Sequence, residues 1–154
     1  MDESVARILS HELSALGFLK KANLWYKRKH DVIQVIGLQK SNWGNQYYVN
    51  VAVWVDKIER KEFPKCQECH IQCRLDSLPD NPDCLLQALD EEDSWKMDTA
   101  TRRDILKLAL CNAEFIFFRE LDSFENVKRY IISGRASKFA VTQSLKRCIQ
   151  SLEP

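Results

Sequence analysis

Residues 47 to 56 show the clearest two-residue period of the chain, and this segment constrains the fold more than any other part. Every second residue is apolar, and the set is Tyr47, Val49, Val51, Val53 and Val55. Successive side chains of a β-strand point to opposite faces of its sheet, so a period of two predicts a strand with one buried face. The chain must therefore build a sheet and cover at least one side of it.

The residues before this segment predict two more strands joined by hairpins. Residues 24–29 are rich in aromatic side chains, and residues 32–40 are apolar at both parities except for Gln34 and Gln39. Such a run is typical of a central strand that is covered on both faces. The sequence SNWGN at 41–45 predicts the hairpin loop that leads into the alternating strand.

Further patterns surround these strands. Residues 69–75 alternate again and predict a fourth strand, whereas residues 76–98 contain eight acidic residues and two prolines, as is typical of a long loop. Apolar residues recur at helical spacing before Gly17, and three more helices are expected after residue 100. We predict one α+β domain, residues 1–154, with an N-terminal helix, a four-stranded, mainly antiparallel sheet and three C-terminal helices packed on one face of the sheet.

Composition narrows the classes of partner and the compartment. Lys and Arg number 23 against 22 Asp and Glu, so no global positive charge exists to hold nucleic acid or an anionic membrane. The N-terminus lacks the features of a secretory signal, and no uninterrupted apolar run reaches the length of a membrane span. We therefore expect a cytoplasmic protein with reduced cysteines.

The side-chain period assigns residues to the two faces of the sheet once the hairpin registers are chosen. With Lys40 opposite Gln46 and Tyr26 opposite Ile33, one face is apolar and is expected to pack against the helices. Its members are Leu24, Tyr26, Ile33, Val35, Val49, Val51 and Val53. The other face collects Trp25, Gln34, Ile36, Tyr48, Asn50, Ala52, Trp54, His70, Gln72 and Arg74.

This second set, which mixes aromatic, amide, imidazole and guanidinium groups, has two interpretations. In one, the face is half-solvated or is covered by the acidic loop through Trp95. In the other, it binds a ligand or a partner, because exposed aromatic and Arg side chains are enriched at interaction sites. A register slip of one residue would exchange the faces.

Two other hypotheses concern chemistry. Cys66, Cys69, Cys73 and Cys84 are candidate zinc ligands, although Cys69 and His70 are neighbours on a predicted strand and so point to opposite faces. The string from Cys66 to His70 also matches a haem attachment motif, which belongs to exported proteins, and we expect no cofactor. An enzyme of unknown reaction would need a concave pocket where four polar residues converge, namely Gln34, Asn50, His70 and Arg74.

Several short motifs together resemble a known bacterial family. They are Gly17-Phe18 followed by Lys20-Lys21, Trp25-Tyr26 with Arg28, Val32 to Ser41, Tyr48 with Asn50, and Cys69-His70 with Arg74-Leu75. In these respects the chain resembles the domain of unknown function 4304 family, over most of residues 10–100. The resemblance implies no established activity, ligand or cofactor.

The hypothesis carried forward is a small binding or interaction module, such as an inhibitor or immunity-type partner of another protein, that uses the non-helical face of the sheet. Polar motif residues are more readily explained by a site or a buried hydrogen-bond network than by packing. The candidate binding residues are Trp25, Arg28, Gln34, Gln39, Asn50, Trp54, His70 and Arg74.

Overall fold

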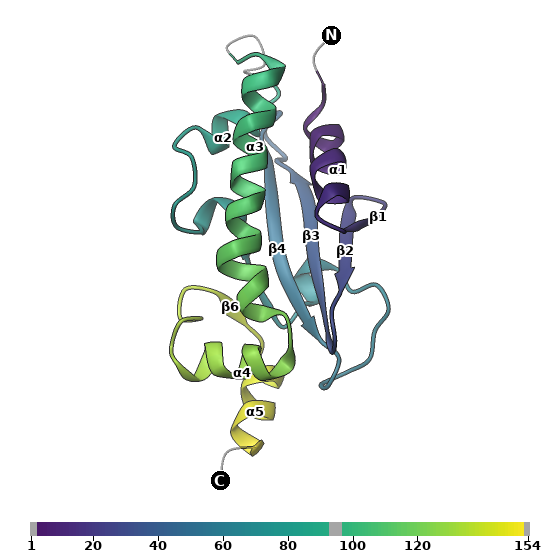
Figure 1. Ribbon diagram of the computed structural model, residues 1–154, viewed down its shortest axis with the longest axis vertical. Helices are drawn as coiled ribbons and strands as arrows, with labels where there is room; N and C mark the ends of the chain where they lie inside the picture. Colours follow the sequence, from purple (N-terminus) through teal and green to yellow (C-terminus); the bar gives the residue numbers. More distant parts are fainter. Residues whose placement is uncertain (1–2, 93–96, 153–154) are drawn as a thin grey trace.

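The computed structural model describes residues 3–92 and 97–152, which form an antiparallel sheet with helices on one side (Figure 1). Within these residues the sheet has six strands in chain order, each antiparallel to the next. The strands are β1 Leu19–Lys21, β2 Leu24–Arg28, β3 Val32–Lys40, β4 Tyr47–Val55, β5 Ile71–Arg74 and β6 Ala140–Val141. The predicted α+β class and antiparallel sheet are confirmed.

Three of the helices begin at residues whose side chains satisfy free backbone N–H groups. Ser4 accepts from Arg7 N, Asp98 from Thr101 N and Ser123 from Asn126 N, as N-caps do. The α-helices are α1 Val5–Ala15, α2 Leu85–Ala88, α3 Thr99–Ala113, α4 Phe124–Ile132 and α5 Gln143–Leu152. Short helices of other types are η1 Cys66–Glu68, η2 Leu75–Ser77, the π-helix η4 Glu114–Phe118 and η5 Arg119–Leu121.

The predicted number of four strands is wrong because both edge strands escaped notice. β1 has three residues, all exposed, and β6 has two, so neither is long enough to show a period of two. Both exist through tertiary pairing: β1 pairs with β2 across a tight turn, and β6 pairs with β5 from about seventy residues away along the chain.

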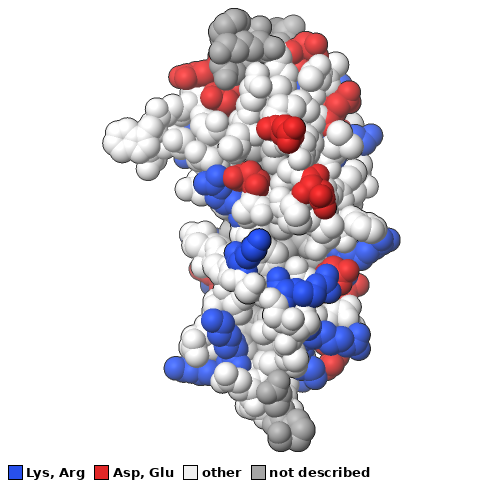
Figure 2. All heavy atoms as spheres, turned by 90° about the vertical axis from the view of Figure 1, so that its left-hand side faces the viewer, with Lys and Arg blue, Asp and Glu red and all other residues white. Residues whose placement is uncertain are grey.

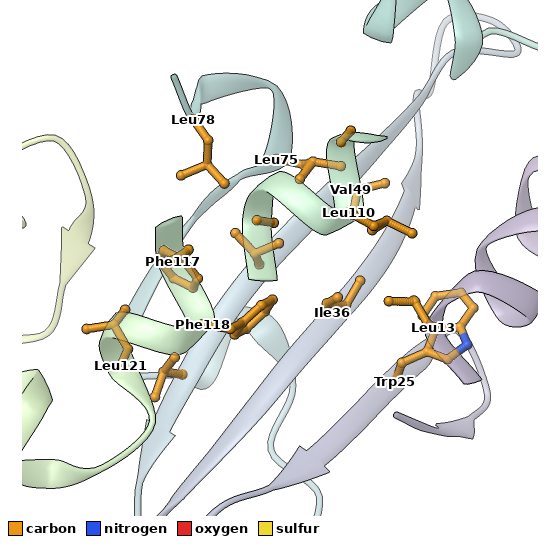
Figure 3. Close-up of a cluster of buried hydrophobic side chains, with 14 of the residues drawn as sticks. Leu13, Trp25, Ile36, Val49, Leu75, Leu78, Leu110, Phe117, Phe118 and Leu121 are labelled. Atoms are coloured by element: carbon orange, nitrogen blue, oxygen red, sulfur yellow. The ribbon is translucent and has the colours of Figure 1, made fainter. Parts of the chain in front are cut away.

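One face of the sheet, which we call the helix face, packs against α1, α3 and the π-helix to form the main core (Figure 1). Figure 3 shows Leu13 of α1 beside Trp25 and Ile36 of the sheet, with Leu110 and Phe118 further along the same layer. Each of these side chains is almost fully buried. Burial of a large apolar side chain contributes about 1.5–3 kcal/mol, so this layer holds the fold together.

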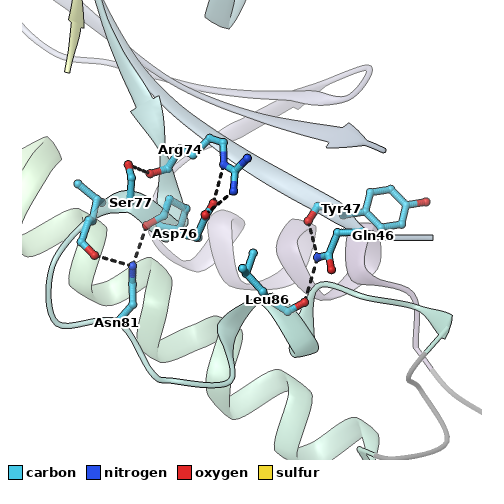
Figure 4. Close-up of polar contacts among 9 residues, drawn as sticks. Gln46, Tyr47, Arg74, Asp76, Ser77, Asn81 and Leu86 are labelled. Carbon is cyan, nitrogen blue, oxygen red and sulfur yellow. Dashed lines mark hydrogen bonds and ion pairs between the residues drawn. The ribbon is translucent and has the colours of Figure 1, made fainter. Parts of the chain in front are cut away.

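The predicted register is wrong by one residue in the β3–β4 hairpin. Lys40 pairs with Tyr47 rather than with Gln46, whereas Tyr26 pairs with Val35, two residues from the predicted partner, which leaves the parity of that hairpin unchanged. Gln46 lies opposite Ser41 instead, whose N donates to the Gln46 carbonyl at 2.8 Å, and Gln46 also forms an isolated bridge with Asp90. Its side-chain Nε2 also donates to the carbonyl of Leu86 at 2.9 Å (Figure 4).

The slip exchanges the faces of β2 and β3 and leaves those of β4 and β5 as predicted. Trp25, Gln34 and Ile36 lie on the helix face, together with Val49, Val51, Val53 and Ile71. The opposite face, which we call the second face, carries Leu24, Tyr26, Ile33, Val35, Tyr48, Asn50, Ala52 and Trp54. The prediction that Trp25 and Gln34 share a face with Asn50 is therefore wrong.

The second face is covered by the connection between β4 and β5, residues 57–70, which passes behind the sheet in Figure 1. This connection contributes Cys66 and Cys69 to a small second cluster that also contains Tyr26, Ile33, Val35, Ala52 and Trp54. Cys66 packs directly against Gly37, where an added Cβ would lie 2.8 Å from the Cys66 Sγ. The absent side chain of Gly37 thus lets the connection approach the sheet.

The acidic loop lies elsewhere than on the second face. Leu85, Ala88 and Leu89 of its described part belong to the main core, and Tyr47 N donates to the Leu89 carbonyl at 2.8 Å. Figure 4 shows the same segment held through Asn81 and through the bond from Gln46 to Leu86. The interpretation that this loop covers the second face is wrong for residues 76–92, and Trp95 lies outside the described residues.

Charge is separated along the molecule although the total is close to zero. Residues 76–92 contain six Asp and Glu and no Lys or Arg, whereas residues 119–152 contain seven Lys and Arg against three acidic residues. Figure 2 shows most of the acidic side chains of this face in its upper half and most of the basic ones in its lower half. Among the described residues, no helix combines the length and the apolar composition that crossing a membrane requires.

Candidate functional site

A hollow of about 530 Å³ opens on the second face beside the 57–70 connection. We call it the amide hollow because four carboxamide side chains line it. Its lining residues are Leu24, Gly37, Leu38, Gln39, Asn50, Cys66, Gln67 and Gln72. The volume falls in the range of small-ligand sites in proteins.

The strand period brings these amides together from four separate segments. Gln39 on β3, Asn50 on β4 and Gln72 on β5 have the parity of the second face, and Gln67 reaches them from η1. Asn50 Nδ2 donates to Gln39 Oε1 at 3.2 Å, and Gln72 Nε2 donates to the Gln67 carbonyl at 3.4 Å. Donors and acceptors left over on these groups are available to a ligand.

No carboxylate, imidazole, ammonium or guanidinium group is among the lining residues of the amide hollow. The one ionisable side chain there is the thiol of Cys66, and burial raises its pKa to about 12. A neutral thiol is a poor nucleophile, so Cys66 is unsuited to covalent catalysis at neutral pH. The arrangement supports reversible binding of an uncharged polar group.

Arg74 lies at the border of the amide hollow, opposite Asn50 in the β4–β5 ladder. Its Nε donates to Asp76 Oδ1 at 2.9 Å (Figure 4), and its guanidinium carbon lies 4.1 Å from the centre of the Tyr48 ring. The hydrogen bond to Asp76 raises the pKa of Arg74 above its usual value. Arg74 is therefore a fixed, permanently charged group at the edge of the site.

His70, the last residue of the 57–70 connection, and Trp54 beneath that connection are both buried rather than exposed on the face. His70 Nδ1 accepts from Val55 N at 2.8 Å, its ring lies 4.3 Å from the Trp54 ring, and Trp54 Nε1 donates to the Glu59 carbonyl at 2.9 Å. Burial lowers the pKa of His70 to about 4, although Asp56 opposes this shift. His70 is therefore neutral at physiological pH and acts as a hydrogen-bond acceptor for the sheet.

Gln34 has a structural partner on the helix face. It is fully buried, and its Nε2 donates to the Phe118 carbonyl at 2.7 Å. Phe118 ends the π-helix, where the regular helical hydrogen bonds are interrupted, so Gln34 satisfies a carbonyl exposed by that irregularity. The pair of Lys27 and Glu114, 3.3 Å apart, joins the neighbouring strand β2 to the same π-helix.

Arg28 lies on the second face, but near the other end of β2, where its Nη1 is 2.8 Å from Asp56 Oδ2. Of the eight predicted binding residues, Gln39 and Asn50 thus line the amide hollow, Arg74 adjoins it, and the other five lie apart from it. Gln34, Asn50, His70 and Arg74 do not converge on one pocket, which contradicts the geometry expected of an enzyme built on them. Binding by any of the eight stays a prediction.

The four candidate zinc ligands do not form one site. Cys66 and Cys69 pack on the second face, whereas Cys73 and Cys84 pack against the main core on the helix side. Burial raises the thiol pKa of Cys66, Cys69 and Cys73, and zinc binds the thiolate. Within residues 3–92 and 97–152, no three His, Cys, Asp or Glu side chains are grouped so as to hold a metal ion.

A family model described as Domain of unknown function (DUF4304) matches residues 9–113, which is more than half of the chain. The chain belongs to this family. The match to the domain of unknown function 4304 model runs from α1 to the end of α3, so it includes the amide hollow and the 57–70 connection but neither α4 nor α5. No curated protein and no solved structure matches the chain.

Three residues at or near the amide hollow of this domain of unknown function 4304 member were not predicted from the sequence. Gly37 interrupts an otherwise apolar strand, and such a glycine signals the close approach of another backbone or side chain. Gln67 lies in η1, a turn too short to show a period, and nothing in the sequence places it over Gln72. Trp43 is 95% exposed at the β3–β4 hairpin, and its position in the SNWGN loop was the available signal.

Proposed function

We propose that this member of the domain of unknown function 4304 family is a non-catalytic module that binds another protein through the amide hollow. The observation that carries the proposal is a 530 Å³ hollow lined by four carboxamides and by no formally charged group. A carboxamide offers one carbonyl acceptor and one NH₂ donor, which match the N–H and C=O of a peptide group. A partner segment can therefore be held by its backbone, without a requirement for charge.

The exposed Trp43 favours a protein as the source of that segment. It extends the end of the sheet from which Gln39 projects, and 95% of its surface is accessible. Aromatic side chains dominate the energy of many protein interfaces because they bury a large area with little loss of side-chain entropy. An isolated small-ligand site would give no role to such a side chain.

The biological class proposed for this binding is an inhibitor or immunity-type partner that acts in the cytoplasm. The six cysteines are all free, and those at 66 and 69 are buried between the 57–70 connection and the sheet. Free cysteines in this number fit a reducing compartment. A protein that works by occupying its partner needs a stable binding surface and no catalytic group, and the lining of the amide hollow, which has no formally charged group, supports this class.

The test is a pull-down from native lysate at physiological salt with the wild-type chain and two variants, Trp43→Ala and the double variant Asn50→Ala/Gln72→Ala. We expect a partner to be recovered by the wild type and its recovery to fall at least about tenfold with each variant, as for interface hot spots. Gln150→Ala is the matched control, because Gln150 is an exposed amide on α5. Equal recovery by all four folded proteins would contradict the proposal.

A further inference from the structure

A second hollow lies toward the other end of the second face, and nothing above gives it a role. Its first compartment, of about 410 Å³, is lined by Leu19, Lys20, Lys21, Tyr26, Arg28, Ile33, Glu62 and Phe63. A neighbouring compartment of about 400 Å³ is lined by Arg28, Arg60, Lys61 and Glu62. Because Arg28 and Glu62 line both compartments, we treat the two as one site and call it the basic hollow.

The first compartment has apolar walls arranged to hold a flat group. Tyr26 and Phe63 meet edge to face with ring centres 5.4 Å apart, and Ile33 is 1% exposed at the base. The Nζ of Lys21 lies 3.6 Å from the centre of the Phe63 ring, so a cation already covers one aromatic face. Leu19, 77% exposed, extends the apolar surface to the rim.

The lining carries an excess of positive charge: five cationic side chains and one carboxylate, Glu62. Arg28 and Lys61 are partly neutralised by Asp56 at 2.8 Å and Glu68 at 2.9 Å. Arg60 and Lys21 have no carboxylate within ion-pair distance in the described part of the chain. In a protein whose formal net charge is +1, this concentration of unneutralised cations is local.

We propose that the basic hollow binds a small aromatic anion, a flat ring that bears a phosphate or a carboxylate. The ring lies against Tyr26, Phe63 and Ile33, and the anionic group is held by Arg60 with Arg28 and Lys61. Arginine suits this role because its planar guanidinium donates two parallel hydrogen bonds to a phosphate or carboxylate. Burial raises the pKa of Tyr26 to about 12, so its hydroxyl remains a neutral donor at physiological pH.

The edge strand favours a small ligand over an extended peptide. β1 has three residues, two of them lysines, and short, lysine-bearing edges oppose the addition of another strand. Each of the two compartments, about 410 and 400 Å³, falls in the size range of small-ligand pockets.

The experiment measures the affinity of purified full-length protein for four probes by calorimetry, with backbone NMR shifts to locate binding. AMP and phenylacetate carry both a ring and an anion, whereas adenosine carries a ring alone and inorganic phosphate a charge alone. We expect at least one of the first two to bind at least about tenfold more tightly than either single-feature probe, with shifts centred on residues 19–21, 26–28 and 60–63. Which of the two binds more tightly tells a phosphate site from a carboxylate site.

Variants connect this binding to the named residues. Arg60→Gln and Lys21→Gln each remove a charge that has no acidic partner, so both proteins are expected to fold. Each should weaken the favoured probe about tenfold, as for loss of a charge-assisted hydrogen bond. Phe63→Leu should weaken the ring-bearing probes and leave phosphate unchanged. Lys40→Gln, an exposed lysine at the opposite end of β3, should change none of the affinities.

Three results would overturn the proposal. The first is a failure of both AMP and phenylacetate to bind at millimolar concentration. The second is phosphate binding as tightly as the tighter-binding of AMP and phenylacetate, which would leave the aromatic walls without a role. The third is an equal loss of affinity in Lys40→Gln and Arg60→Gln, which would reduce the effect to net charge. Because the amide hollow is not involved, none of these results bears on the proposed protein partner.

Discussion

The two faces of this sheet are built from the same strands, yet they differ in what covers them. Two long helices and the π-helix lie over the helix face, and its side chains belong to the main core. A single connection of fourteen residues, 57–70, lies over the second face. Because so short a segment cannot cover six strands, a hollow is left on each side of it, and both proposed sites lie there.

The two tryptophans of the sheet, one on each face, show the difference between the faces in the hydrogen bonding of their indole nitrogens. Trp25 on the helix face is 1% exposed, and its Nε1 has no hydrogen-bond partner among the described residues. Trp54 on the second face is 3% exposed, and its Nε1 donates to the carbonyl of Glu59. Apolar burial is large enough on the helix face to tolerate an unpaired donor, whereas the thinner cover of the second face is held partly by specific hydrogen bonds.

The largest predicted effect comes from removing the tryptophan of each face. Trp25→Ala should lower the free energy of unfolding by about 3–5 kcal/mol, because a rigid layer of helices cannot close the cavity. Trp54→Ala should lower the free energy of unfolding by about 1–2 kcal/mol less than Trp25→Ala does, because the 57–70 connection can relax into the space. Urea unfolding gives both values, and hydrogen exchange should show faster exchange at 57–70 in Trp54→Ala alone. A larger loss of stability in Trp54→Ala would contradict the distinction between the faces.

A second prediction concerns pH and the buried His70. Its pKa is about 4 in the folded protein against 6.5 when unfolded, so between these values the unfolded state binds a proton that the folded state lacks. Stability should therefore be complete above about pH 6.5 and fall as pH drops toward 4, with a loss of about 2–3 kcal/mol by pH 4.5. Urea unfolding of the wild type and of His70→Asn at pH 7.5 and 4.5 isolates this contribution. Equal pH dependence in the two proteins would show that His70 is not held neutral.

The smallest predicted effect tests how closely the 57–70 connection approaches the sheet. Gly37→Ala should cost about 1–2 kcal/mol, because the new Cβ would lie 2.8 Å from the Cys66 Sγ. In a Cys66→Ala background the same substitution should cost little, so the two changes should not be additive. Gly44→Ala is the matched control, since nothing lies within 4 Å of an added Cβ there. Additive losses of stability from the two substitutions would mean that Cys66 does not pack against Gly37.

Patterns that depend on local chemistry were predictable from the sequence. The N-terminal helix ends where Gly17 adopts a φ of +91°, a conformation that glycine reaches without strain. The alternation from Tyr47 to Val55 correctly identified β4 and assigned Val49, Val51 and Val53 to the helix face. These features follow from the side-chain period and from backbone preferences, and both are properties of neighbouring residues.

The candidate site was less predictable, because its parts are brought together over long sequence separations. Asn50, Gln72 and Arg74 were expected on one face of the sheet and lie on it, whereas Gln39 comes to that face only through the register of the β3–β4 hairpin. Gln67 joins them only through the course of the 57–70 connection. The basic hollow combines β1 with Arg60 and Phe63, some forty residues later. No local pattern reports such contacts.

The sequence by itself determined that this chain forms an antiparallel sheet with helices on one side, since periodicity and turn residues act locally. Only the tertiary structure decided which face of β2 and β3 meets the helices. That choice depends on a one-residue difference in the hairpin, where Gln46 bonds to Leu86 and bridges to Asp90 instead of pairing with Lys40. A period of two divides the side chains of a strand between two faces, but it does not tell which face meets the helices. In this chain the observed register is accompanied by a contact with a residue more than forty positions away.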